Sequence, residues 1–93
     1  MASRKDLKKD IDYLVFELIA DCYGCIYENP DMDLSGFEVV INEAIQLKED
    51  LIIRINQFNP TESGNSRKYF KSVRHDLVNG LKGGYEKLNT ILG

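Results

Sequence analysis

The sequence predicts an all-α fold, an up-down-up three-helix bundle, and three observations support this fold class. Apolar residues recur at i, i+3, i+4 and i+7 in three long stretches, which is the spacing of amphipathic helices. No stretch alternates convincingly with the two-residue period of a strand. Short polar segments around Pro30 and Pro60 separate the stretches, and short connections make successive helices antiparallel neighbours. We therefore expect one helical domain over residues 1–93, built around a single core.

The first helix is expected over residues 4–29. Ser3 and Asp6 resemble a capping box with Asp in the usual Glu position, and Pro30 disfavours helical geometry in the residue before it. At about 100° per residue, one arc of this helix is apolar along its whole length and requires a core. That arc consists of Leu7, Ile11, Leu14, Val15, Leu18, Ile19, Cys22, Cys25 and Ile26.

A second, largely aromatic stripe lies on roughly the opposite side of the same helix. Its members are Phe16, Ala20, Tyr23 and Tyr27, with Tyr13 at the edge. A helix at the rim of a small bundle needs only one apolar face, so this stripe requires a further cover. The cover is the third helix or the first loop, a second copy of the chain, or a small molecule. We expect a homodimer, which would form a larger helical bundle, because exposed apolar patches usually mark association and tyrosine suits interfaces.

The second helix is expected over residues 36–58. Ser35, with Glu38 three positions later, forms a capping box that predicts its start, and Asn59-Pro60 predicts its end. The apolar arc of this helix is about 160° wide, which suits a helix that touches two neighbours. The arc contains Phe37, Val40, Ile41, Ala44, Ile45, Leu47, Leu51, Ile52, Ile55 and Phe58.

The third helix is expected to begin between residues 62 and 67 and to run to residue 92. Three glycines lie within it, where each costs roughly 0.5–1 kcal/mol relative to alanine. Gly80 and Gly84 either let a neighbouring helix approach closely, or the helix kinks or ends near Gly83-Gly84. The apolar face comprises Phe70, Val73, Leu77, Leu81, Tyr85, Leu88 and either Ile91 or Leu92.

Cys22 and Cys25 form a C-x-x-C motif, which in other contexts binds metal or carries out redox chemistry. Here the motif lies near the end of a helix and beside Asp21, and both features raise a thiol pKa. A zinc site needs further ligands, and the single histidine, His75, lies far from the motif in the expected bundle. We expect two core cysteines and no metal, with a metal or redox protein as an alternative.

Other polar side chains give no pattern for catalysis. His75 lacks a nucleophile or a second histidine nearby, and the glycines of the third helix do not form a phosphate-binding loop. Lys48 projects into the apolar arc of the second helix, where it either reaches water, contacts a ligand or forms a buried ion pair, for instance with Glu17. We expect no enzymatic activity and no cofactor.

Basic residues gather at one end of the expected bundle, and acidic residues at the other. Because the first and third helices start at the same end, their basic first turns meet there, beside Arg54. This arrangement favours an anionic partner such as nucleic acid as the alternative function, although the net charge of −3 and the pI near 5.1 argue against it. The basic residues are Arg4, Lys5, Lys8, Lys9, Arg67, Lys68, Lys71 and Arg74.

The composition, 43% hydrophobic and 29% charged, is that of an ordinary soluble protein and not of a membrane-spanning one. Charged residues interrupt the first helix too often for a signal peptide, so we expect a cytoplasmic protein with reduced cysteines. The sequence thus favours a non-enzymatic protein that acts through protein–protein association. The alternatives are a nucleic-acid-associated or regulatory module that uses the basic end, and the metal or redox protein.

The opening of the chain resembles the start of short uncharacterised helical proteins of Bacteroides-type bacteria. The resemblance covers about the first quarter of the chain and implies a small cytosolic helical protein. It implies no activity and no functional residues. The similar segments are Arg4-Lys5-Asp6-Leu7-Lys8-Lys9-Asp10-Ile11 and Glu17-Leu18-Ile19-Ala20-Asp21-Cys22.

Overall fold

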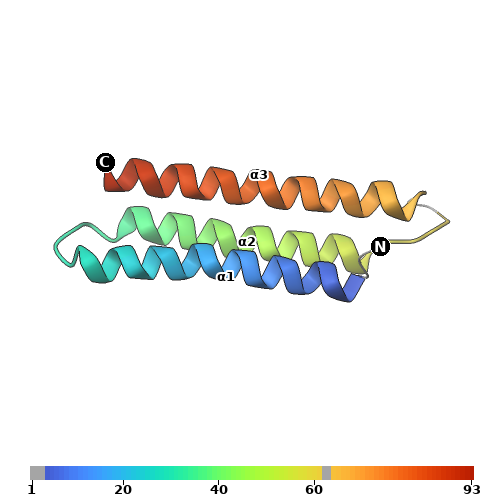
Figure 1. Cartoon of the computed structure of the whole chain (residues 1–93), viewed down its shortest axis with the longest axis horizontal. Helices are drawn as coiled ribbons and strands as arrows, with labels where there is room; N and C mark the ends of the chain where they lie inside the picture. The colour runs from blue at the N-terminus through green and yellow to red at the C-terminus, as the bar shows by residue number, and fades with distance from the viewer. Residues whose placement is uncertain (1–3, 62–63) are drawn as a thin grey trace.

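Three long helices form the structure, a computed structural model that describes residues 4–61 and 64–93. They are α1 (Arg4–Glu28), α2 (Ser35–Asn56) and α3 (Ser66–Leu92), and each runs antiparallel to the one before it (Figure 1). The predicted all-α, up-down-up three-helix bundle is therefore confirmed. The molecule is a rod of 53 × 18 × 17 Å, because the helices lie side by side along their full lengths.

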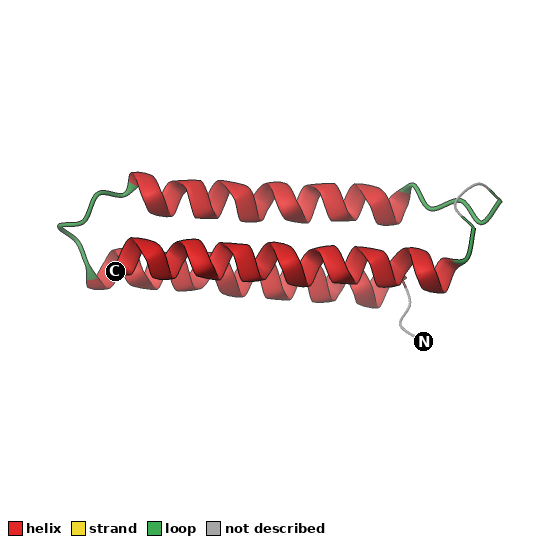
Figure 2. Ribbon diagram, turned by 90° about the horizontal axis from the view of Figure 1, so that it is seen from above, coloured by secondary structure: helices red, strands yellow, loops and turns green. Residues whose placement is uncertain are grey.

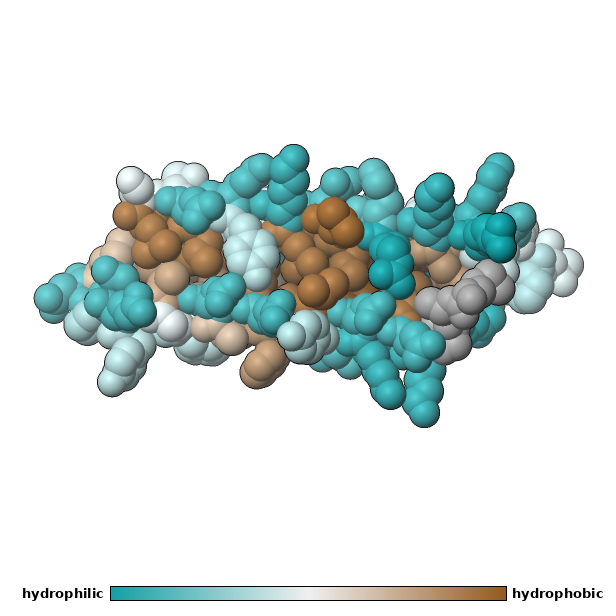
Figure 3. All heavy atoms as spheres, in the orientation of Figure 1, coloured by the Kyte–Doolittle hydropathy of each residue, from teal (hydrophilic) through white to brown (hydrophobic). Residues whose placement is uncertain are grey.

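The helices form two layers. Seen from above, α1 and α3 lie in one layer and α2 lies in the other, packed against both (Figure 2). On the face shown in Figure 3, apolar side chains gather along the middle, between α3 at the top and α1 at the bottom, with polar side chains along both edges. Within the described ranges, no helix combines the length and the apolar character needed to cross a membrane.

One hydrophobic core runs along the rod, and residues at helical spacing on each helix supply it. Ile91 packs against this core while Leu92 is exposed, which settles the choice that the sequence left open at the end of α3. Among the described residues, the core contains no buried polar or charged side chain. The buried residues are Leu7, Ile11, Val15, Leu18, Cys22, Phe37, Val40, Ala44, Leu51, Ile55, Phe58, Val73, Leu77 and Leu88.

The predicted capping box at the start of α2 is wrong. Ser35 belongs to the first turn, and the preceding Leu34 has helical backbone angles and makes no side-chain capping bond. The carboxylate of Asp33 accepts the Ser35 backbone N–H at 3.0 Å instead. Two acceptor side chains compete at this helix start, and the loop brings Asp33 to the free N–H. The other predicted cap, Ser3, lies outside the described residues.

Asn65 caps α3 and places its first residue at Ser66. Its side-chain oxygen accepts the backbone N–H groups of Arg67 at 2.8 Å and of Lys68 at 3.4 Å. α2 ends at Asn56, two residues before the expected position 58. Phe58 follows it with a non-helical backbone but still places its ring in the core.

α3 continues through its three glycines without a break and without a sharp bend (Figure 1), so it neither ends early nor kinks near Gly83-Gly84. A Cβ atom on Gly80 would lie 2.5 Å from Cδ2 of Leu47 in α2. A Cβ atom on Gly84 would lie 2.6 Å from Cδ2 of Leu18 in α1. Both distances are far below van der Waals contact. The two glycines therefore let α3 approach both neighbouring helices closely, as the sequence allowed.

Candidate interaction surfaces

The aromatic face of α1 is exposed at each of its residues, which we define as Tyr13, Phe16, Ala20, Tyr23 and Tyr27. Its aromatic residues have exposed fractions of 63%, 67%, 59% and 87% in chain order. The opposite side of α1 packs against α2 and α3. The idea that the third helix or the first loop covers Phe16 and Tyr23 is therefore wrong. Glu17 raises the pKa of the Tyr13 hydroxyl through a hydrogen bond and its negative charge.

A groove between α1 and α2 widens this apolar surface. Tyr23 and Ile26 form one wall, and Leu34 and Ile41 contribute to the other, around a volume of about 380 Å³. Leu34 and Ile45, the latter about one helical turn beyond Ile41, are more than two-fifths exposed. The apolar spacing of the sequence predicts an exposed apolar surface on α1 alone and places Ile45 in the core arc of α2. Only the packing of α2 against α1 brings Leu34 to this groove and leaves Ile45 exposed.

The basic end exists as the charge pattern predicts, because α1 and α3 both begin there and α2 ends there (Figure 1). Part of its charge is engaged within the chain. Arg74 pairs with Asp10 at 3.2 Å, and Arg54 pairs with Asp76, whose pKa its hydrogen bond lowers. Lys5, Lys9, Arg67, Lys68 and Lys71 are exposed. That this end binds an anionic partner stays a prediction.

An aromatic cluster underlies the basic end, and the apolar spacing of the sequence did not predict it. The rings of Phe58, Tyr69 and Phe70 lie 5.0–5.6 Å apart, centroid to centroid. The Arg4 guanidinium lies 5.3 Å from the centre of the Phe58 ring and 5.9 Å from that of Phe70, within cation–π range. The Tyr69 hydroxyl donates to the Arg54 carbonyl at 2.7 Å. Arg4 therefore has an internal role that ties the start of α1 to α3.

Lys48 forms an ion pair, but neither with Glu17 nor in the core. Its Nζ atom lies 3.2 Å from Oδ1 of Asp12 on α1, and both side chains are about half exposed. The lysine stem crosses the junction of α1 and α2 and its charge remains hydrated. Exposed pairs of this kind add little stability.

Cys22 is a fully buried thiol in the core, and Cys25 is half-buried. Burial raises the pKa of the Cys22 thiol, and the charges of Cys25 and Asp21 raise it further. These observations favour the core role predicted for Cys22, because nucleophilic and metal-binding cysteines act as thiolates. Among the described residues, no group of three or more His, Cys, Asp and Glu side chains is placed to hold a metal. His75 is exposed and lies near Asn79 and Asp76.

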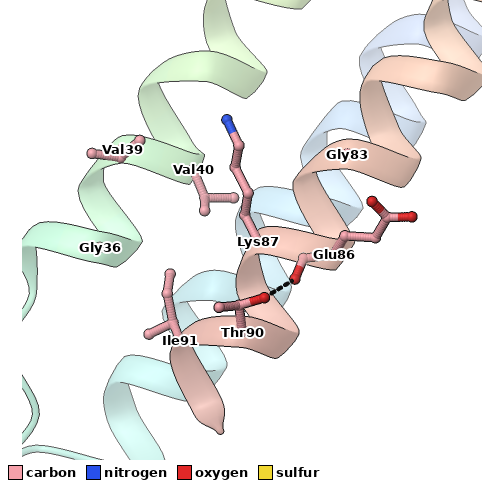
Figure 4. A pocket seen from close by; sticks show the side chains of 8 residues that line it. All are labelled: Gly36, Val39, Val40, Gly83, Glu86, Lys87, Thr90 and Ile91. Atoms are coloured by element: carbon pink, nitrogen blue, oxygen red, sulfur yellow. Dashed lines mark hydrogen bonds between the residues drawn. The ribbon is translucent and has the colours of Figure 1, made fainter.

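A second groove, of about 550 Å³, lies between the start of α2 and the end of α3 (Figure 4). It is open because Gly36 and Gly83 on its walls lack side chains, and Val39, Val40 and Ile91 line it with methyl groups. Lys87, at its edge, pairs with Glu43. Thr90 donates its hydroxyl to the Glu86 carbonyl of its own helix. The Lys87 and Thr90 side chains at this groove are thus already engaged within the chain.

Comparisons of the chain with known protein families, with curated proteins and with solved structures gave no match. The resemblance of the N-terminal quarter to bacterial helical proteins stays a prediction. The function is therefore inferred from the surfaces themselves.

Proposed function

We propose that this protein acts by association with a second copy of itself through the aromatic face of α1, and that it has no catalytic role. The observation that carries the proposal is the exposure of four aromatic side chains, by 59–87%, on one side of one helix. Monomeric proteins rarely expose a contiguous apolar patch of this kind, and such patches usually mark interaction sites. The free cysteines fit the reducing cytoplasm, where we propose that the protein acts.

The size of the surface suits a dimer. An aromatic side chain buries about 150–250 Å², so four that are about two-thirds exposed offer roughly 500 Å² per copy. Leu34 and Ile45, with the polar rim, extend this area toward the roughly 800 Å² per partner of a standard interface. Tyrosine serves such a surface well, because its ring packs while its hydroxyl stays hydrated or finds a partner.

Sedimentation velocity of two matched variants tests the proposal. Wild type at high micromolar concentration should sediment at twice the monomer mass of 10.6 kDa. Phe16→Asp/Tyr23→Asp should sediment as a monomer with unchanged helix content, since both positions are exposed and the substitutions disturb no core contact. Val78→Asp is the control, because Val78 is similarly exposed, at 56%, but lies on α3. A wild-type monomer overturns the proposal, and so does a dimer that only Val78→Asp dissociates.

A further inference from the structure

Charged residues are distributed unevenly along this chain, so the two ends of the aromatic face differ in charge. Residues 10–47 contain nine Asp and Glu side chains and no Lys or Arg. Residues 4–9 carry four basic side chains and one acidic one. α1 therefore runs from a basic start to an acidic end, and the loop that follows it adds Asp31 and Asp33.

Two lysines continue the aromatic face toward the start of α1. Eighteen residues make five helical turns of 3.6, so Lys5 lies in line with Tyr23, and Lys9 lies in line with Tyr27. Both lysines are exposed, and they form no ion pair within the part of the chain that the structure describes. One side of α1 thus presents two lysines, then aromatic side chains, then the acidic loop around Asp31.

We infer that two copies pack their aromatic faces in antiparallel orientation, about a two-fold axis that crosses α1 between Phe16 and Ala20. This inference rests on the proposed function, since it requires that the aromatic face pairs with itself. The crossing at position 18 sets the large Phe16 ring of one copy opposite the small Ala20 of the other, so that a ring fills a gap on each side of the axis. It also sets Lys9 opposite Tyr27, where the ammonium lies against an aromatic ring.

Charge complementarity selects this orientation. In the antiparallel pair, Lys5 of each copy lies beside Asp31 of the other, and Glu28 lies beside the basic first turns of α1. In a parallel pair, by contrast, the acidic ends would face each other and the basic ends would face each other. Lys87 pairs with Glu43 at that end, but within the described residues Glu28, Asp31 and Asp33 form no ion pair that would relieve the repulsion. The partner that best fits each charged end is therefore the opposite end of a second copy.

Charge reversal tests the orientation. Lys5→Glu/Lys9→Glu should weaken the wild-type dimer about tenfold or more, because each end then opposes like charges. Glu28→Lys/Asp31→Lys should weaken it similarly. Combining all four changes in one chain should restore the dimer, since both ends become complementary again. In a parallel dimer, each double variant only replaces a contact between like charges with another contact between like charges. Two double variants that dimerise as tightly as wild type would therefore overturn the inference.

Disulfide cross-linking provides a second readout in a Cys25→Ser background. In the antiparallel dimer the two copies of Lys9→Cys lie about 27 Å apart along the axis, at 1.5 Å per residue, and should not cross-link. A mixture of Lys9→Cys and Tyr27→Cys chains should form the mixed disulfide under mild oxidation. A dimer in which Lys9→Cys links only to itself overturns the orientation but leaves the proposed function standing. A wild-type monomer overturns both.

Discussion

The three glycines of α3 provide a graded test of how closely the helices pack. Alanine in the interior of a helix makes the folded protein more stable than glycine does, by about 0.5–1 kcal/mol. The reason is that a chain with alanine has less backbone freedom to lose when it folds. The space around each glycine decides whether this gain is realised. Around Gly83, a Cβ atom meets nothing within 4 Å. Gly83→Ala should therefore raise the free energy of unfolding by nearly the full amount, or the melting temperature by about 3–5 °C.

Gly84→Ala should have the opposite sign. Its Cβ would lie 2.6 Å from Cδ2 of Leu18, against ordinary carbon contacts of about 3.5–4.0 Å. Leu18 is 1% exposed, so its Cδ2 methyl group must move aside within the packed core. Overpacking of this kind costs about 1–3 kcal/mol, which exceeds the helix gain, so a net destabilisation of about 1 kcal/mol is expected. Gly80→Ala should fall between the other two variants, because the opposing Leu47 is half-buried and can move toward solvent, whereas Leu18 is fully buried.

Thermal and urea denaturation followed by far-UV circular dichroism measure these differences. All variants are compared at one protein concentration, because dimerisation couples to apparent stability. The Leu18→Ala substitution should also destabilise the Gly84→Ala chain less than the wild type, since it removes the opposing methyl groups. Equal stability of the Gly83→Ala and Gly84→Ala proteins would refute the close approach of α1 and α3.

Two further predictions concern single side chains. The hydrogen bond from Ser35 lowers the Asp33 pKa below its ordinary value of 3.8. The stability that the ionised Asp33 carboxylate adds to the folded protein is therefore complete above pH 3.8, and it is lost as the pH falls through the lower pKa of the folded state. The stability difference between wild type and Asp33→Asn, measured by urea denaturation, should therefore narrow on acidification below that range; a difference independent of pH would contradict the assignment. In a thiol-labelling assay at neutral pH, Cys25→Ser, which retains the buried Cys22, should react far more slowly than Cys22→Ser, and urea should abolish the difference. Equal rates in the folded proteins would show that Cys22 is accessible.

The number, order and faces of the helices follow from sequence alone. Apolar spacing identified the core sides of all three helices, and Pro30 marked the end of α1 within one or two residues. α2 begins within one residue of the predicted position 36 and α3 begins inside the predicted range 62–67, but the side chains that cap them did not follow from the sequence. Ser35, Asp33 and Asn65 are all good capping side chains, and the path of each loop decides which one reaches a free N–H.

Side-chain contacts between helices could not be predicted from the sequence, for a similar reason. The partner of Lys48 is Asp12 rather than Glu17, and Ile45 lies at an exposed rim rather than in the core. Both outcomes depend on the rotation of α2 about its axis relative to α1. Local helix geometry does not set that rotation, because it comes from the interlocking of side chains along the whole contact.

The sequence by itself determined that α1 has two apolar sides, because a period of 3.6 residues assigns every side chain to a side of its helix. Only the tertiary structure decided which side is covered. Two helices packed along the Ile11 and Leu18 side leave the far side of α1 in water, so the Phe16 and Tyr23 rings stay exposed. A helix in a three-helix bundle contacts its two neighbours over only one arc of its surface. The packing of side chains from all three helices together decides which arc that is.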